Sequence, residues 1–260
     1  MSLPVALQLW TVKQHASKDF AETLKKVKEI GYDLVELADL YGLTPREIRT
    51  ALRAAGVKAI AAHVSVEDLI REPEQTISVY KRIGVKYIVL PNVPENMRPG
   101  IAEDYDAVLK QIAQIGQHCG EQGIELLYHN HDFEFNKMPD GTYGLDYMFG
   151  HLPWEYLRPE LDLGFIKTVG EEPTEYLKKY YGQVPVVHLK DYVKVDSSDV
   201  YPDGLKNCPL GQGIQDMPAI LDETVNCYVK YVVVEQDDPN ELDEIEAAKQ
   251  SRDYLRSLGW

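Results

Sequence analysis

The segment LLYHNHDFEF, residues 126–135, places many ligand-type side chains directly after an apolar run. Within six positions it offers His129, Asn130, His131, Asp132 and Glu134. Imidazoles and carboxylates bind divalent metal ions, and the same groups take and return protons in catalysis. The segment therefore predicts a metal site or a catalytic site, against the plainer alternative of a polar loop that carries histidines.

The elements around this segment alternate between short apolar runs and longer stretches of helical periodicity. The runs that predict strands span 4–10, 32–38, 57–63, 85–92, 124–130, 157–164, 184–191 and 231–237. Helices are expected at 19–31, 44–56, 66–83, 102–122, 173–182 and 239–259, with short helices within 144–150 and 214–225 and a long polar loop over 192–213. Such alternation implies parallel strands joined by right-handed crossovers.

A chain of 260 residues with this pattern predicts an α/β fold, a single-domain (β/α)8 TIM barrel over residues 1–260. An open, doubly wound sheet is the alternative. The first strand runs into LQLWTVKQH, which lacks the GxGxxG turn expected of a dinucleotide-binding sheet. We find no internal repeat or linker that would divide the chain.

In a TIM barrel the active site lies at the carboxyl ends of the strands. The predicted strands end in a set of mostly polar side chains, namely Gln8, Trp10, Glu36, His63, Asn92, His129, His131, Asp162, His188, Lys190, Glu235 and Gln236. Buried ionisable groups are costly unless they are paired or bind something. Their convergence on one edge of the barrel predicts one polar site.

Within this set, Asp162, His188 and Glu235 end three consecutive strands, next to the strand that carries residues 129–134. Carboxylates with an imidazole suit Mn²⁺, Co²⁺, Mg²⁺, Fe²⁺ or Zn²⁺. Open coordination positions on such an ion accept two oxygens of a polyol or hydroxy-ketone. The ion then polarises a carbonyl and stabilises an enediolate. We expect a divalent metal cofactor whose identity the sequence leaves open.

The motifs YHNHDFEF, ELDLG, VVHLKD, PLGQG and VVVEQD, in this order, resemble the xylose isomerase-like TIM-barrel superfamily of sugar phosphate isomerases and epimerases, which also includes family 2 apurinic endonucleases. The resemblance covers essentially the whole chain. It implies a metal ion held by Glu, Asp, His and Glu from strands 5 to 8. Asp162, His188 and Glu235 match the last three ligands. For the first, we expect Glu134, with His129 or His131 as the alternative.

The function that this resemblance and these residues favour is an isomerase or epimerase for a sugar, keto-sugar or inositol derivative. Glu134 or Glu235 would remove a proton next to a carbonyl, and the other carboxylate or His131 would return it. The alternative is a dehydratase or lyase for an inosose or a 3-keto-glycoside, in which the enediolate expels a neighbouring oxygen that His131 protonates.

Other strand-end residues are expected to contact the substrate, a small sugar or polyol. They are Trp10, Glu36, His63, His129, Lys190 and Gln212. Plainer roles compete for some of them: Lys190 would pair with Asp191, and the PLGQG segment would be only a tight glycine turn.

The bulk composition argues against other classes of protein. The formal net charge is -15, which disfavours broad contact with nucleic acid and hence a DNA-repair endonuclease. No apolar run approaches the roughly 20 residues that span a bilayer, and the N-terminus lacks a signal-peptide pattern. The 3 cysteines show no framework spacing, so we expect a cytoplasmic protein. A homo-oligomer is compatible with the sequence, and a non-catalytic barrel is the less favoured alternative.

Overall fold

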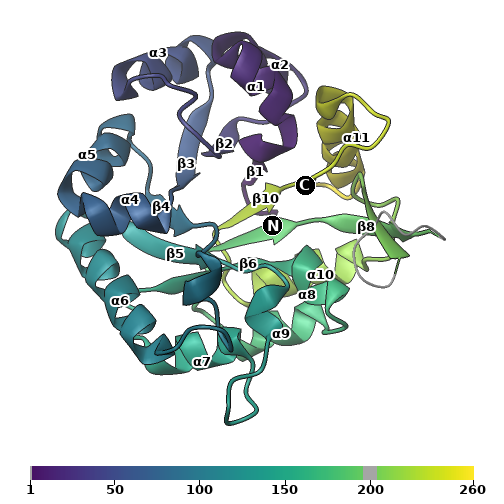
Figure 1. Cartoon of the computed structure of the whole chain (residues 1–260). Coiled ribbons are helices and arrows are strands. Elements are labelled where there is room, and N and C mark those ends of the chain that lie inside the picture. The colour runs from purple at the N-terminus through teal and green to yellow at the C-terminus, as the bar shows by residue number, and fades with distance from the viewer. Residues whose placement is uncertain (1, 196–203) are drawn as a thin grey trace.

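The computed structural model describes residues 2–195 and 204–260, and it shows a closed barrel of parallel strands (Figure 1). The strands follow one another around the barrel in the order β1-β10-β7-β6-β5-β4-β3-β2. Their bounds are β1 Val5–Gln8, β2 Leu34–Leu37, β3 Lys58–His63, β4 Tyr87–Leu90, β5 Glu125–His129, β6 Arg158–Asp162, β7 Val186–Leu189 and β10 Tyr231–Val234. The predicted single-domain (β/α)8 TIM barrel is thus confirmed.

Helices surround the barrel as an outer ring (Figure 1). They are α1 Lys13–Lys18, α2 Phe20–Glu29, α3 Pro45–Ala55, α4 Val66–Arg71, α5 Pro73–Ile83, α6 Tyr105–Glu121, α7 Gly144–His151, α8 Leu163–Thr168, α9 Pro173–Lys179, α10 Met217–Asn226 and α11 Glu244–Ser257. Short 3-10 turns lie at Leu9–Val12, Glu95–Met97 and Phe133–Phe135. No helix in residues 2–195 and 204–260 is long and apolar enough to cross a membrane.

Local sequence signals explain where α3 begins and ends. The Thr44 hydroxyl accepts a hydrogen bond from the Glu47 amide, and the Glu47 carboxylate accepts one from the Thr44 amide. This reciprocal capping, with Pro45 in the first turn, fixes the start of the helix. Gly56 ends it at φ 70°, a left-handed conformation that glycine adopts without strain.

The predicted strands 4–10 and 157–164 are too long, because their last residues lie in the 3-10 turn Leu9–Val12 and in α8. Two further segments also differ from their predicted structure. The helix expected over 66–83 is two helices, α4 and α5, because Pro73 has no amide hydrogen to continue the first one. The loop expected over 192–213 contains two antiparallel strands, β8 Asp191–Lys194 and β9 Leu205–Cys208. The remainder of that predicted loop, residues 196–203, lies outside the described residues.

The inward face of five strands, β1, β3, β5, β7 and β10, changes from apolar to polar toward the carboxyl end. A small buried cluster inside the barrel includes Ala6, Ala61, Leu127, Val186 and Val233. Side chains two positions apart share a strand face. The residues two positions further on are Gln8, His63, His129, His188 and Glu235. An apolar layer therefore supports a polar layer, which is where the fold positions its chemistry.

Close packing between α6 and the segment before β6 leads to a stability prediction. A Cβ atom on Gly116 would collide with the backbone oxygen of Tyr156, whereas one on Gly120, in the same helix, would meet nothing within 4 Å. We expect Gly116→Ala to destabilise the protein by about 1–3 kcal/mol through overpacking. Gly120→Ala should stabilise it by about 0.5–1 kcal/mol because alanine favours the helix. Urea unfolding of both variants measures this, and equal effects would contradict it.

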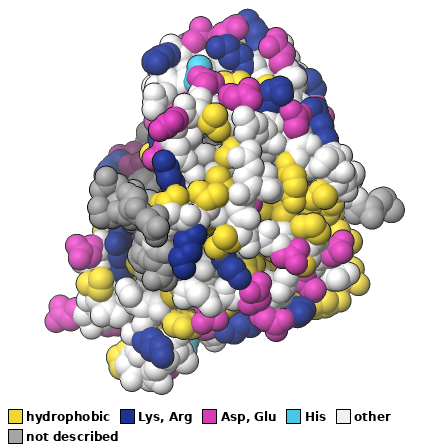
Figure 2. Space-filling view, turned by 90° about the vertical axis from the view of Figure 1, so that its right-hand side faces the viewer, with side chains coloured by type: hydrophobic (Ala, Val, Ile, Leu, Met, Phe, Trp, Pro, Cys, Tyr) yellow, Lys and Arg dark blue, Asp and Glu magenta, His cyan; other side chains and the backbone are white. Residues whose placement is uncertain are grey.

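The outer surface carries mixed charge on the face drawn in Figure 2. Lys and Arg side chains lie there among Asp and Glu side chains and between small hydrophobic patches. Over its described residues, this face offers alternating charge rather than a continuous basic surface.

Candidate active site

A cavity of about 600 Å³ opens at the carboxyl ends of the strands. Its apolar lining includes Trp10, Pro91 and Phe165, and its polar lining includes His63, His129, His131, Lys190, Glu235 and Asp237. Concave sites with a few convergent polar groups are the usual form of a small-molecule site. The strand ends thus meet in one pocket, as the sequence predicts.

Four buried side chains beside this cavity bring ligand atoms together, and we call them the pocket-side group: His129, Asp162, His188 and Glu235. One ligand atom from each lies within 4.8 Å of the others. His188 Nδ1 is 2.9 Å from Glu235 Oε2, and His129 Nε2 is 3.7 Å from Asp162 Oδ2. They come from the ends of β5, β6, β7 and β10, which are neighbours in the barrel.

The two side-chain oxygens of Asp162 make different contacts. Oδ1 accepts a hydrogen bond from the Phe165 amide at 2.8 Å and so caps α8. Oδ2 faces the pocket-side group and accepts no hydrogen bond from the described residues, although Lys190 Nζ lies 3.1 Å away. The Asn130 side chain fixes this position, because its Oδ1 accepts the Asp162 amide at 2.9 Å.

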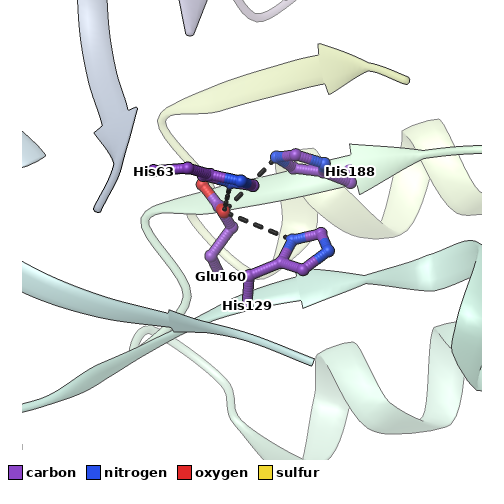
Figure 3. A group of neighbouring side chains, drawn as sticks. All are labelled: His63, His129, Glu160 and His188. Atoms are coloured by element: carbon purple, nitrogen blue, oxygen red, sulfur yellow. Dashed lines mark hydrogen bonds and ion pairs between the residues drawn. The ribbon is translucent and has the colours of Figure 1, made fainter. Parts of the chain in front are cut away.

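Below the pocket-side group lies a second set of side chains, which we call the inner group: Glu36, His63 and Glu160. The nitrogens of His63, His129 and His188 converge on Glu160 Oε2 at 3.2, 3.4 and 3.3 Å (Figure 3). His188 Nε2 is also 2.7 Å from Glu36 Oε2. Glu36 and Glu160 are fully buried, so these imidazoles are their main compensation.

Charge coupling within the two groups shifts several pKa values. Burial alone lowers the pKa of His188, but Glu160, Glu36 and Glu235 raise it well above its ordinary value. Burial, and then the carboxylate of Glu160, raise the pKa of Glu36 to about 7. Burial and the nearby His188 lower the pKa of His129 to about 3, so this imidazole is neutral and offers a lone pair.

Lys190 is the cation that neutralises the pocket-side carboxylates in this structure. Its Nζ lies 3.1 Å from Asp162 Oδ2, 3.0 Å from Glu235 Oε2 and 2.8 Å from Asp237 Oδ2. Although burial lowers the pKa of Lys190, these carboxylates raise it well above its ordinary value. The expected pairing of Lys190 with Asp191 is not what the structure shows, since the Asp191 carboxylate accepts backbone amides of the PLGQG segment instead.

The donor set of the pocket-side group fits a divalent metal ion. Ligand atoms bound to one ion at about 2.0–2.2 Å lie roughly 3–3.6 Å apart. The distances of 2.9 Å for His188–Glu235 and 3.7 Å for His129–Asp162 lie close to that range. Two carboxylates balance the charge of the ion, and Asp162 Oδ2 is a buried oxygen that makes no hydrogen bond to the described residues beyond its ion pair with Lys190. Two imidazoles with two carboxylates suit Zn²⁺, Mn²⁺, Fe²⁺ or Co²⁺.

Glu134, the first ligand expected from the sequence, does not join the pocket-side group. Both of its oxygens are hydrogen-bonded: Oε1 accepts the Tyr128 hydroxyl at 2.7 Å, and Oε2 accepts the His131 amide at 2.7 Å. Burial raises the pKa of Glu134 to about 7. The residue of this segment that belongs to the pocket-side group is His129, the alternative first ligand, and its binding of an ion stays a prediction.

A substitution of Glu134 tests whether Glu134 or His129 is the first metal ligand. Glu134→Gln should leave divalent-metal affinity unchanged, because neither oxygen faces the pocket-side group. It should destabilise the fold by about 1–3 kcal/mol, since the amide disturbs two buried hydrogen bonds. Metal titration and urea unfolding of the same sample measure both quantities. A loss of metal binding without a loss of stability would restore Glu134 as the ligand.

His131 lines the cavity beside the pocket-side group without joining it. Its ring stacks on Phe133 with a centroid distance of 5.5 Å and lies 4.9 Å from the ring of Phe165. Burial, with smaller effects of His129 and Lys190, lowers the pKa of His131 well below its ordinary value. Its Nδ1 finds no hydrogen-bond partner among the described residues. A neutral imidazole so placed can accept a proton from a bound molecule.

The residues expected to contact substrate fall into two sets. Trp10, His63, His129 and Lys190 line the cavity, and Trp10 is 46% exposed with Lys13 Nζ 4.0 Å above its ring. The other two do not line it. Glu36 lies in the inner group beneath His188, and the Gln212 amide donates to Gln250 on the surface at 2.9 Å.

Sequence reasoning missed Glu160. It lies two positions before Asp162 and therefore on the same inward strand face. A carboxylate inside an otherwise apolar, buried strand indicates that it has a buried partner. Glu160, the first residue of the ELDLG motif, is such a carboxylate.

Comparisons with known proteins agree with this architecture. The model of the family described as xylose isomerase-like TIM barrel matches residues 24–258. An inosose dehydratase of Mesomycoplasma hyopneumoniae is 26% identical over an alignment of length 171, which covers 60% of this chain and 55% of the relative. In that match the chain spans about half the length of the relative. The enzyme of that name from strain J is 21% identical over 271 residues, covering 92% of this chain and 88% of the relative.

Solved structures share the fold along the whole chain. A sugar phosphate isomerase/epimerase from Parabacteroides distasonis superimposes with a TM-score of 0.83 at 22% identity, covering 98% of each chain. The IolI protein, solved with a binding zinc atom, superimposes with a TM-score of 0.74 at 16% identity, covering 99% of this chain and 98% of that one.

Proposed function

Because the chain belongs to the xylose isomerase-like TIM-barrel family, we propose that it is a divalent-metal-dependent enzyme that dehydrates a keto-polyol such as an inosose. The observation that carries the proposal is the pocket-side group, whose four ligand atoms lie together beside a cavity of about 600 Å³. The relatives named inosose dehydratase support the choice of substrate class and of dehydration.

His129, Asp162, His188 and Glu235 would hold the metal ion. Bound there, the ion would act as a Lewis acid that polarises the ketone and stabilises negative charge on its oxygen. The substrate's polar groups would face these residues and Lys190, while Trp10 and Phe165 would contact its apolar face.

His131 lines the cavity outside the pocket-side group, and it would be the base. Its imidazole would remove the proton from the carbon next to the ketone, leaving an enediolate and an imidazolium. When the hydroxyl on the next carbon leaves, the imidazolium protonates it, so that water departs and the imidazole is neutral again. The proton, the electron pair and the leaving group are then balanced without a further reactant.

Isomerisation or epimerisation is the second candidate. Both reactions share the first proton transfer, and they differ only in whether His131 returns the proton to a carbon or to the leaving hydroxyl. His131 lines the cavity in either case, so the outcome would depend on whether the imidazolium lies closer to a carbon of the enediolate or to the hydroxyl oxygen in the β position.

Proton NMR in deuterated water tests the proposal. Inososes, ketoses and 3-keto-glycosides are incubated with protein loaded with Zn²⁺ or Mg²⁺, and with EDTA-treated protein as the control. We expect loss of water from an inosose with the loaded protein only. Deuterium uptake with the carbon skeleton retained would instead establish the isomerase or epimerase. A panel in which no carbon-bound proton exchanges and no water is lost would contradict the proposal.

A further inference from the structure

The imidazoles of His129 and His188 separate the two groups, and each presents one nitrogen to either side. His188 Nδ1 is 2.9 Å from Glu235 in the pocket-side group, whereas its Nε2 is 2.7 Å from Glu36 in the inner group. His129 Nε2 is 3.7 Å from Asp162, whereas its Nδ1 is 3.4 Å from Glu160. Figure 3 shows the inner side of this arrangement around Glu160.

Either side of these two imidazoles has the composition of a metal site. Together with His63 and Glu160 of the inner group, His129 and His188 also bring ligand atoms within 4.8 Å of one another. A neutral imidazole, however, has one lone pair and one N–H. When one ring nitrogen binds a metal ion, the other carries the hydrogen and donates it. His129 and His188 can therefore each offer a lone pair to a metal ion on one side only, either at the pocket-side group or at the inner group.

Two observations assign the metal to the pocket-side group. Histidines of both groups line the cavity, but of the four carboxylates only Glu235 of the pocket-side group does, whereas Glu36 and Glu160 are fully buried away from it. The charged neighbours also differ: Oε2 of Glu36 and Oε2 of Glu160 face imidazoles, at 2.7 Å from His188 and 3.2 Å from His63. Asp162 Oδ2 and Glu235 Oε2 lie 3.1 and 3.0 Å from the Lys190 ammonium, so the fold already places a cation beside the pocket-side group.

We propose that Glu36 and Glu160 are positioning residues that hold the hydrogen of His188 on Nε2 and that of His129 on Nδ1, so that Nδ1 and Nε2, respectively, face a single metal ion. This inference rests on the proposed metal site. It makes the inner group the support of that site rather than a second metal site. Carboxylates that accept the far N–H of a ligand histidine fix its tautomer and its orientation and raise its basicity.

The cost of losing either carboxylate follows from this role. Replacement of such an outer carboxylate lowers metal affinity by about 10–100-fold in other proteins. Glutamine keeps the shape and one acceptor oxygen but loses the charge. We therefore expect Glu36→Gln and Glu160→Gln each to weaken Zn²⁺ binding by about 10–100-fold. Glu244→Gln is the matched control, since Glu244 is a buried carboxylate outside both groups that accepts the amides of Gln14 and His15.

The experiment titrates Zn²⁺ into metal-free wild-type protein and the three variants against a competing chelator. Mass spectrometry under native conditions counts the ions bound to each chain. Long-range ¹H–¹⁵N NMR of the histidine rings in the Zn²⁺-loaded protein reports the tautomers. We expect one ion per wild-type chain, weaker binding in Glu36→Gln and Glu160→Gln, unchanged affinity in Glu244→Gln, and a His188 ring protonated on Nε2 that loses this tautomer in Glu36→Gln.

The possible outcomes separate the inference from the proposed function. Two ions per wild-type chain would make the inner group a metal site and overturn the inference alone. One ion per chain with unchanged affinity in both variants would overturn it too. Wild-type protein that binds no divalent ion would overturn the proposed function and, with it, the inference. If both variants fail to fold, the tautomers in the Zn²⁺-loaded wild type decide: hydrogens on Nε2 of His188 and Nδ1 of His129 support the inference, and the opposite tautomers overturn it.

Discussion

Glu235→Gln is expected to lower the affinity for Zn²⁺ by more than about 100-fold, beyond the loss caused by an outer carboxylate. Glu235 Oε2 lies 2.9 Å from His188 Nδ1, within the pocket-side group, and its carboxylate supplies half of that group's negative charge. Although burial raises the pKa of Glu235, Lys190 and His188 hold it well below its ordinary value, so the group is ionised and ready to bind. Chelator competition measures the loss, and dehydration of an inosose should disappear at a Zn²⁺ concentration that saturates the wild type.

The matched control is Asp132→Asn. Asp132 lines the same cavity but belongs to neither group of ligand atoms. Its replacement removes one negative charge from the pocket and should leave Zn²⁺ affinity nearly unchanged. If both variants lost affinity equally, the general field of the acidic pocket would explain the binding, and Glu235 would not be a ligand.

Lys190→Met is expected to destabilise the metal-free protein by about 3–5 kcal/mol, the usual cost of removing one partner from a buried ion pair. Lys190 is 1% exposed, and its ammonium lies within 3.1 Å of Asp162, Glu235 and Asp237. Methionine fills the space of the stem but supplies no charge. A bound divalent ion would restore positive charge, so Zn²⁺ should stabilise this variant more than it stabilises the wild type.

Urea unfolding with EDTA and with Zn²⁺ measures both effects. The control is Lys249→Met, because Lys249 pairs with Asp253 at 2.7 Å on the surface, where both side chains are nearly half exposed. Such a pair contributes about 0.3–0.5 kcal/mol. Equal destabilisation of the two variants would show that Lys190 does not neutralise the buried carboxylates.

The barrel could be predicted from the sequence because its strands are short apolar runs and its helices carry clear start and stop signals. Thr44, Pro45 and Gly56 mark both ends of α3, and the structure confirms them. The hairpin of β8 and β9 could not be predicted in the same way. Its described strands carry mixed polar and apolar residues without a regular alternation along the sequence. They pair next to the hydrogen bonds that the Asp191 carboxylate accepts from the PLGQG backbone.

The site was predictable where a residue ends its strand and less so elsewhere. His63, His129 and Asp162 each close a strand, His188 is the last residue but one of β7, and Glu235 follows directly after β10. Glu160 lies one inward position earlier, so the rule of strand ends passes over it.

The first ligand depended on information that the sequence does not carry. Glu134 and His129 are both ligand-type residues within one short segment. Only the 3-10 turn at Phe133–Phe135, which returns Glu134 to Tyr128 and to the His131 amide, separates them.

The most direct test of the account is an anomalous-difference map from crystals of the protein grown with Zn²⁺. We predict one peak per chain at about 2.0–2.2 Å from His129 Nε2, Asp162 Oδ2, His188 Nδ1 and Glu235 Oε2. A peak among Glu36, His63 and Glu160, or no peak in the barrel of a fully Zn²⁺-exposed crystal, would contradict the account.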